Sequence, residues 1–238
     1  MNDLGRGLIE LCGEDSLKFL QGQVSCDLNN ADQQIIRGCH CTPQGRVIFL
    51  FSARVESQQR ILLETHPSIV ETAIASLSKY AVFSKTEITD ISTQNSSIEP
   101  PITPIERLRL GIPDITLDTT EQFIPQMLNL DLLDYINFKK GCYTGQEVVA
   151  RAHYRGQVKR RMHHLSLSCL SVPSPNTAIS DREGKQLGSI VNAVSSDDSV
   201  EALAVLSDKA LNCDNLVIDN QSVAVSYHSM PYQSTDNA

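Results

Sequence analysis

The chain has 238 residues, of which 41% are hydrophobic and 20% charged, so it can bury the core of one large domain or of two smaller ones. It has no tryptophan and only 5% aromatic residues, which disfavours base stacking as its main surface chemistry but leaves phosphate binding open. Its formal net charge is −8, and its seven cysteines show no paired CxxC spacing, so neither a disulfide framework nor a four-cysteine zinc site is indicated. The N-terminus lacks a cationic flank followed by an apolar run, and no eighteen apolar residues occur in succession, which predicts a cytoplasmic protein without membrane contact.

The first predicted elements are a short helix and a β-hairpin. Asp15 and Ser16 supply capping oxygens ahead of apolar residues that recur on one helical face, namely Leu17, Leu20 and Val24. Residues 46–55 and 61–65 are rich in branched and aromatic side chains, and the polar residues between them predict a turn. The hairpin is expected to be entered from a turn at residues 43–45.

A second helix and a connector are predicted next. Ser68 and Glu71 have the spacing of a capping box, and apolar residues then recur at helical spacing up to Ala81. Together with the hairpin, this helix predicts an α+β layer. Residues 92–104 are polar and contain prolines, which predicts an exposed loop or a subdomain boundary.

Beyond Gln157 the pattern changes to short apolar runs separated by turn residues. These runs span residues 164–170, 188–194, 200–206, 216–218 and 222–227. Their spacing predicts a small antiparallel β-barrel. We therefore expect a first domain over residues 1–156 and a barrel domain over residues 157–238.

Residues 139–161 combine a cysteine with a concentration of positive charge. The segment holds seven basic residues and one acidic residue, a charge of +6 that leaves −14 for the remainder. Cys142 follows Lys139 and Lys140, and a nearby cation stabilises the thiolate that acts as nucleophile or soft ligand. The absence of side chains at Gly141 and Gly145 would let a ligand approach the sulfur, and a short helix is predicted to begin at Gln146.

Cys39 and Cys41 suggest metal binding at first sight, because His40 lies between them. A third and a fourth ligand are not apparent, so no metal site is assigned. A strand that places both cysteines on one core face explains the spacing better.

Two longer stretches resemble a known family. Residues 123–133, FIPQMLNLDLL, and 137–151, NFKKGCYTGQEVVAR, closely resemble the signature of the YgfZ family, folate-binding relatives of the glycine-cleavage T-protein. Shorter matches are FLQGQV at 19–24, TPQGR at 42–46 and GIP at 111–113. The resemblance spans most of the chain up to about Arg161.

The resemblance implies a fold, a cofactor and a role. The fold would be α+β, a T-protein-like folate-binding domain with mixed or antiparallel sheets and helices, followed by a small antiparallel barrel. The cofactor would be tetrahydrofolate or a derivative, and the protein would support assembly or repair of iron–sulfur clusters through transient complexes with client or assembly proteins. The family's marked cysteine falls on Cys142, with Lys140 beside it as a second functional residue. The implied cofactor-binding residues are Gly141, Tyr143, Gly145, Gln146, Glu147, Arg151 and Arg155.

Departures from the T-protein pattern bear on the reaction. Phe49 and Leu50 stand where T-protein aminomethyltransferases carry an acidic pair, and Arg109 stands where an acidic residue would contact the pterin ring. The residue best placed to act as a general acid or base in a conventional aminomethyl transfer is therefore missing from this chain. Two alternatives to the iron–sulfur role stay open: a folate-dependent one-carbon transferase, and a tRNA-binding or tRNA-modification module that uses residues 139–161.

Overall fold

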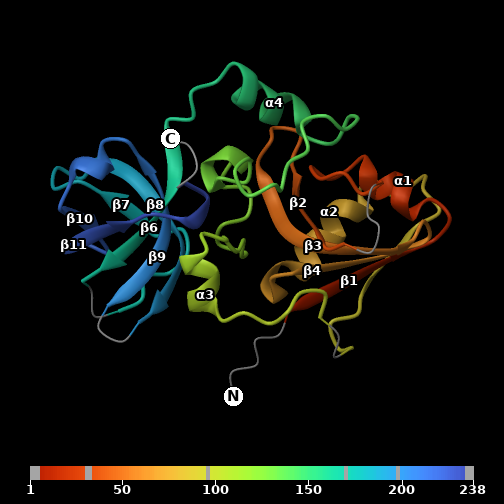
Figure 1. Ribbon diagram of the computed structural model, residues 1–238, viewed down its shortest axis with the longest axis horizontal. Helices are drawn as coiled ribbons and strands as arrows, with labels where there is room; N and C mark the ends of the chain where they lie inside the picture. The colour runs from red at the N-terminus through yellow and green to blue at the C-terminus, as the bar shows by residue number, and fades with distance from the viewer. Residues whose placement is uncertain (1–5, 30–33, 95–96, 169–170, 197–198, 234–238) are drawn as a thin grey trace. The chain divides into compact units, whose positions relative to one another are not determined.

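The computed structural model describes residues 6–29, 34–94, 97–168, 171–196 and 199–233, and the chain divides into two compact units (Figure 1). The first, here called the sheet unit, comprises Met1–Pro101, Ile115–Pro125 and Asp134–Arg155. The second, the barrel unit, comprises Ile102–Asp114, Gln126–Leu133 and Gly156–Ala238. Two segments that precede residue 156 in sequence thus group with the barrel.

The sheet unit is built on a five-stranded antiparallel sheet in the order β2-β3-β4-β1-β5. Its strands are β1 (Gly7–Cys12), β2 (Ile36–Cys41), β3 (Val47–Ser57), β4 (Arg60–Thr65) and β5 (Glu87–Asp90). Its helices are α1 (Ser16–Gln21), α2 (Val70–Ser78) and α4 (Gln146–Tyr154). The predicted hairpin is confirmed as β3 and β4, and Gly45 adopts φ 72° in the turn that precedes it.

The first helix is shorter than its apolar pattern predicts. Leu17 and Leu20 lie in α1, but the helix ends at Gln21, and Val24 instead forms an isolated bridge with His40 of β2. Asp15 occupies the N-cap position without a side-chain capping bond, because its carboxylate accepts a hydrogen bond from the backbone N–H of Lys85.

The capping box predicted at Ser68 and Glu71 is wrong. A 3₁₀ turn, Pro67–Ile69, precedes α2, and the Ser68 hydroxyl bonds to Nδ1 of His66. The capping box that the structure does contain is formed by Thr103 and Glu106, at the start of α3 (Pro104–Arg109) in the barrel unit. Pro104 occupies the first helical position, where its missing N–H costs no hydrogen bond.

The core of the sheet unit lies between the sheet and the helices α1 and α2. Alternate residues of each strand point to one face, where Ile9, Phe49 and Leu63 pack with Leu20 of α1 and Leu77 of α2. All five side chains are fully buried. This packing fixes β2 and β3, on which the candidate site depends.

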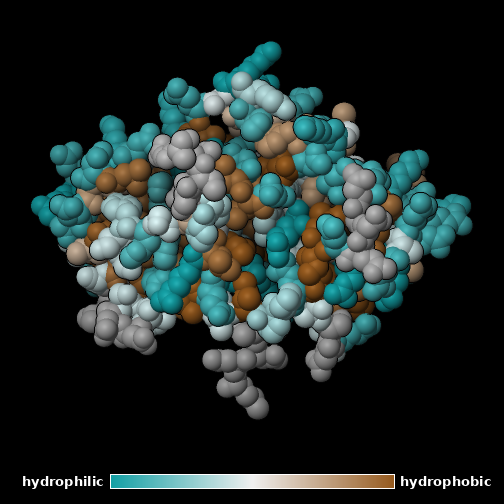
Figure 2. Space-filling view, viewed as in Figure 1, coloured by the Kyte–Doolittle hydropathy of each residue, from teal (hydrophilic) through white to brown (hydrophobic). Residues whose placement is uncertain are grey.

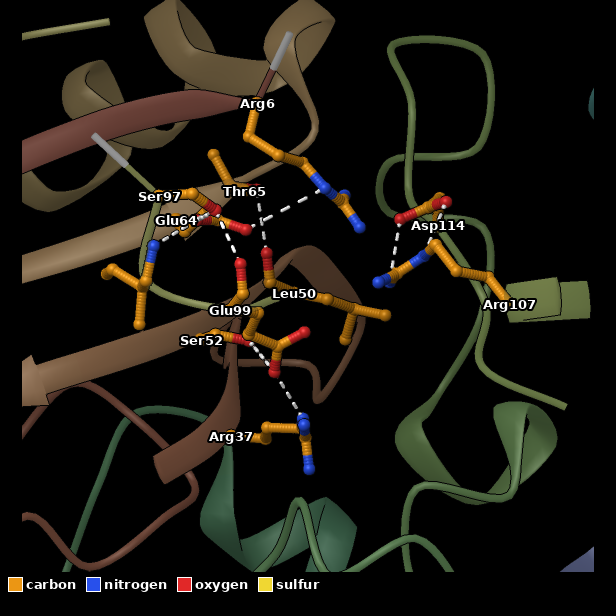
Figure 3. A network of polar contacts seen from close by, with 11 residues as sticks. Arg6, Arg37, Leu50, Ser52, Glu64, Thr65, Ser97, Glu99, Arg107 and Asp114 are labelled. Atoms are coloured by element: carbon orange, nitrogen blue, oxygen red, sulfur yellow. Dashed lines mark hydrogen bonds and ion pairs between the residues drawn. The ribbon is translucent and has the colours of Figure 1, made fainter. Parts of the chain in front are cut away.

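The opposite face of the sheet carries buried polar groups (Figure 3). Glu64 of β4 accepts hydrogen bonds from the Ser97 hydroxyl and the Ile98 backbone N–H. Ser52, opposite Glu64 on β3, donates to Glu99, which also pairs with Arg37 of β2. Residues 97–99 are thereby held on this face through two carboxylates. Arg107 and Asp114, also drawn in Figure 3, pair with each other within the barrel unit.

The predicted antiparallel barrel is confirmed and is closed by six strands in the order β10-β11-β6-β9-β8-β7. The strands are β6 (Arg160–Leu167), β7 (Ala178–Ser180), β8 (Gln186–Ser195), β9 (Val200–Ser207), β10 (Asn215–Ile218) and β11 (Gln221–His228). Sequence analysis missed β7, and residues 169–170 of the first predicted strand lie outside the described residues. Within the described part of the chain, none of the helices is long and apolar enough to cross a membrane.

The buried position of Phe49 makes it a test of the core. Phe49→Ala should lower the free energy of unfolding by about 3–5 kcal/mol, because a fully buried aromatic ring is replaced by a cavity. Phe83 is fully exposed, at 101%, so Phe83→Ala should change the free energy by less than about 0.5 kcal/mol. Urea unfolding of both variants measures the difference, and comparable losses would contradict the packing described.

His40 makes the stability of the sheet unit depend on pH. Its ring bonds to the carbonyl oxygen of Gln23 and the hydroxyl of Ser76, and burial lowers the pKa of His40 to about 4. As the pH falls from 6.5 to 4, His40 gains a proton in the unfolded chain but stays neutral in the folded protein. The free energy of unfolding should therefore decrease over this range by an amount on the order of 3 kcal/mol. His40→Gln should flatten this part of the profile in urea unfolding. Equal slopes for the two proteins would argue against burial of a neutral imidazole.

Candidate functional site

The candidate site is built on residues 137–145, the loop segment that leads into α4. Asn137 begins a tight turn, since its side-chain oxygen accepts hydrogen bonds from the backbone N–H groups of Lys139 and Lys140. The backbone N–H of Asn137 donates to the carbonyl oxygen of Ser25, which ties the turn to the segment after α1. The loop therefore starts from a fixed position.

Lys140 clamps this loop to the interior. Its ammonium group donates to the carbonyl oxygens of Gln21, Val24 and Cys26, at 2.8, 2.7 and 2.6 Å. It also lies 5.4 Å from the centre of the Tyr143 ring. Burial lowers the pKa of Lys140 to about 8, and the neighbouring Cys26 opposes that shift. The positive charge of Lys140 is thus directed at the carbonyl oxygens and thiols beneath the loop.

Three buried cysteines lie under the loop. The Sγ atoms of Cys39 and Cys41 are 3.7 Å apart and both residues are buried in β2, so the two side chains share one face of the strand, as predicted. This is the face of Leu50, which lies opposite Cys39, and neither cysteine belongs to the core cluster around Phe49. Burial raises the pKa of Cys26 to about 12, and burial also raises the pKa of Tyr143, with Cys39 adding to that effect. Among the residues that the structure describes, no group of three or more histidine, cysteine or acidic side chains could hold a metal ion.

The two glycines of the motif have different roles. Gly145 adopts φ 84°, and a Cβ atom there would lie 2.5 Å from the carbonyl oxygen of Thr42 and 3.1 Å from Cβ of Cys41. Gly145 therefore allows the start of α4 to approach the turn before β3. A Cβ at Gly141 would meet nothing within 4 Å, so the space beside this residue is open.

The loop presents Cys142 on the surface while its neighbours hold it from beneath. Cys142 and Gly141 are exposed, whereas Tyr143 is buried and Lys140 is half-buried. Gln146 and Glu147 open α4, and the side chains of Glu147 and Arg151 are exposed along the helix. In the view of Figure 2, mainly hydrophilic side chains lie where Figure 1 shows α4.

Sequence analysis missed an aromatic cluster at the C-terminal end of α4. Phe138 stacks on His153 with ring centres 3.8 Å apart and an interplanar angle of 16°. Tyr154 meets both rings edge-on, at 6.2 Å from Phe138 and 4.7 Å from His153. Phe138 lies within the motif and His153 within the basic segment, and the separation of fifteen residues gives no sign that their rings meet.

The two departures from the T-protein pattern have structural explanations. Phe49 is part of the hydrophobic core, and Leu50 is also buried, so neither position offers a carboxylate. Arg109 of α3 forms a bidentate pair with Glu201 of β9, and the other contact of Glu201 is Nε2 of His164. The hydrogen bond from Arg109 lowers the pKa of Glu201, with a further contribution from His164. Arg109 is thus an ion-pair partner inside the barrel unit.

Comparisons with known proteins place this geometry in a class. The fold is that of glycine cleavage system aminomethyltransferase T: the crystal structure of the Bartonella henselae protein covers 96% of this chain, and the chain covers 84% of that protein, with a TM-score of 0.71 and 14% identity. No family model matches the chain.

Two curated relatives carry the same name, tRNA-modifying protein YgfZ. The protein of Colwellia psychrerythraea strain 34H is 30% identical over 246 residues, which cover 76% of this chain and 74% of the relative. The protein of Yersinia pestis strain Pestoides F is 26% identical over an alignment 302 residues long, gaps included. The alignment covers 97% of this chain and 91% of the relative. The chain belongs to the YgfZ family.

The contrast between the two glycines of the motif can be tested by paired substitutions. Gly145→Ala should destabilise the sheet unit by about 1–3 kcal/mol, because alanine is strained at this φ and its Cβ would contact Thr42. Gly141→Ala should change stability by less than about 0.5 kcal/mol, since its Cβ enters open space. Urea unfolding gives both values, and a large loss for Gly141→Ala would show that this glycine is required by the fold itself.

Proposed function

We propose that this chain is a tetrahydrofolate-binding accessory factor that supports the iron–sulfur clusters of enzymes that modify tRNA, with Cys142 as its functional thiol. The relatives are named tRNA-modifying proteins, which supports the link to tRNA modification. The aminomethyltransferase T fold supports a folate ligand. The iron–sulfur role follows from the family resemblance of the motif around Cys142.

The observation that carries the proposal is the placement of Cys142. Its side chain is exposed beside the open space at Gly141, on a loop that Lys140 and Gly145 hold to the sheet unit. A thiolate is a preferred ligand of iron in clusters, but a single cysteine cannot hold a cluster alone. The proposed complex with a client or assembly protein is therefore transient, and the cluster is cargo.

The residues fit a folate tail better than they fit a pterin ring. Positions 49 and 50 offer no carboxylate, and Arg109 is engaged by Glu201. The exposed guanidinium groups of Arg151 and Arg155 suit the carboxylates of a folate tail and equally the phosphates of RNA. These residues do not favour aminomethyl transfer as the function.

The test is complementation of cells that lack this chain. Wild type should restore the fraction of a tRNA nucleoside whose modification requires an iron–sulfur enzyme, as measured by mass spectrometry of total tRNA. Cys142→Ser should restore it at least about tenfold less well, because a serine hydroxyl is a poor ligand for iron where a thiolate is preferred.

Cys12→Ser is the matched control, since Cys12 is also an exposed free cysteine of the sheet unit. It should behave as wild type at equal protein abundance. Full restoration of tRNA modification by Cys142→Ser would show that the thiol of Cys142 is not required for the function. If deletion of the chain leaves both tRNA modification and iron–sulfur enzyme activity unchanged, the proposed function itself is wrong.

A further inference from the structure

The aromatic cluster at the end of α4 is largely exposed, and three exposed basic residues lie close to it along the chain. Tyr154 is 67% exposed, and the side chain of His153 is also exposed. Lys139 follows Phe138 directly, Arg151 lies one helical turn before Tyr154, and Arg155 follows it. Contiguous exposed apolar surface with a polar rim is a feature of interaction sites.

The combination fits unpaired nucleotides. Base faces stack on aromatic side chains, and guanidinium and ammonium groups bind the phosphates between successive bases. Because the C-terminal end of a helix alone disfavours anions, the basic side chains at residues 139, 151 and 155 are what would make this end attractive to a phosphate chain. An apolar pocket of a protein partner would accept the rings but would leave these cations without a complement.

We propose that Phe138, His153 and Tyr154, together with Lys139, Arg151 and Arg155, form a binding site for unpaired nucleotides of RNA. The inference rests on the proposed function in tRNA modification, and it assigns the anion at Arg151 and Arg155 to RNA phosphates in place of a folate tail. Tyr154 supplies the ring on which a base stacks, and the rings of Phe138 and His153 pack against the Tyr154 ring.

Contacts within the protein hold the rings of this cluster in place. Asn137 fixes the turn that carries Phe138, and Lys140 clamps the same segment to the segment after α1. Phe138 in turn holds His153 and Tyr154 through ring contacts. A preorganised stacking surface loses little conformational freedom on binding, which favours affinity.

Tryptophan fluorescence can test this site directly, because the chain contains no tryptophan. Tyr154→Trp introduces a single fluorophore at the proposed stacking surface, and Phe83→Trp introduces one at a fully exposed position elsewhere in the sheet unit. Both variants are titrated with a single-stranded RNA of about ten nucleotides, with an unmodified tRNA transcript, and with a blunt RNA duplex.

Saturable quenching of Tyr154→Trp by single-stranded RNA and by tRNA, but little by the duplex, is the expected result, with Phe83→Trp unchanged. In anisotropy measurements with the labelled RNA, Tyr154→Ala should weaken binding about fivefold or more, whereas Tyr154→Phe should stay within about twofold. Arg151→Gln should reduce the dependence of log affinity on log salt by about 0.7, the value for one phosphate contact on a single strand.

Two outcomes would overturn the inference. Absence of saturable quenching at low salt would mean that the cluster does not bind RNA, and a protein partner would then be the better explanation. Equal quenching by single strands, by the duplex and by a polyanion without bases would reduce the site to a charged patch. Circular dichroism and melting curves of each variant show whether the fold is retained, which the exposure of Tyr154 predicts.

Failure of this inference can be told from failure of the proposed function. In the complementation assay, Tyr154→Ala should lower tRNA modification, whereas activity of an iron–sulfur enzyme that does not act on tRNA should be retained. If Tyr154→Ala restores tRNA modification fully while Cys142→Ser does not, the thiol function stands and the RNA site falls.

Discussion

The loop that carries Cys142 depends on one set of contacts, the hydrogen bonds from the Lys140 ammonium group to three backbone carbonyl oxygens beneath the loop. Carbonyl groups that converge from residues 21–26 would be unsatisfied without a donor, and a buried ammonium would be costly without acceptors. Each group thus stabilises the other. The contact joins the segment after α1 to the segment before α4, and it explains why neighbouring side chains of the motif point in opposite directions.

This arrangement changes the role that Lys140 was expected to have. From the sequence, its charge is predicted to act on the thiol two residues away, but the ammonium faces Cys26 and the carbonyl oxygens under the loop. The motif thus holds an exposed sulfur next to the open space beside Gly141. In the proposed function, a partner that binds in this space would supply the remaining groups of the site.

Sequence patterns predict those parts of the fold that local chemistry determines. The β3–β4 hairpin and the barrel follow from alternating apolar residues and turn residues, and the barrel needs no long-range information to be recognised. The two helix starts show the limit. Ser68 has the spacing of a capping residue, but it lies inside a 3₁₀ turn whose N-cap is His66. At Thr103, by contrast, the threonine is itself the N-cap, and Glu106 lies where its side chain can complete the capping box. The motif points to Tyr143 and Gly145 as candidate residues. It cannot show that Tyr143 is buried or that Gly145 packs closely against Thr42, because these contacts depend on β2 and on the turn before β3.

The low aromatic content of the chain is an average over 238 residues, so it says nothing about where the rings gather. Phe138 and Tyr154 are distant in sequence, yet their ring centres lie 6.2 Å apart, and Lys140 holds the segment that carries Phe138. Phe138 and Cys142 also belong to the same segment, which Asn137 and Lys140 hold in place. In the proposed scheme, RNA at the rings and an iron–sulfur client at the thiol would therefore bind only a few residues apart. Direct contact between the two ligands across the surface of residues 138–142 is then the shortest route by which one could influence the other.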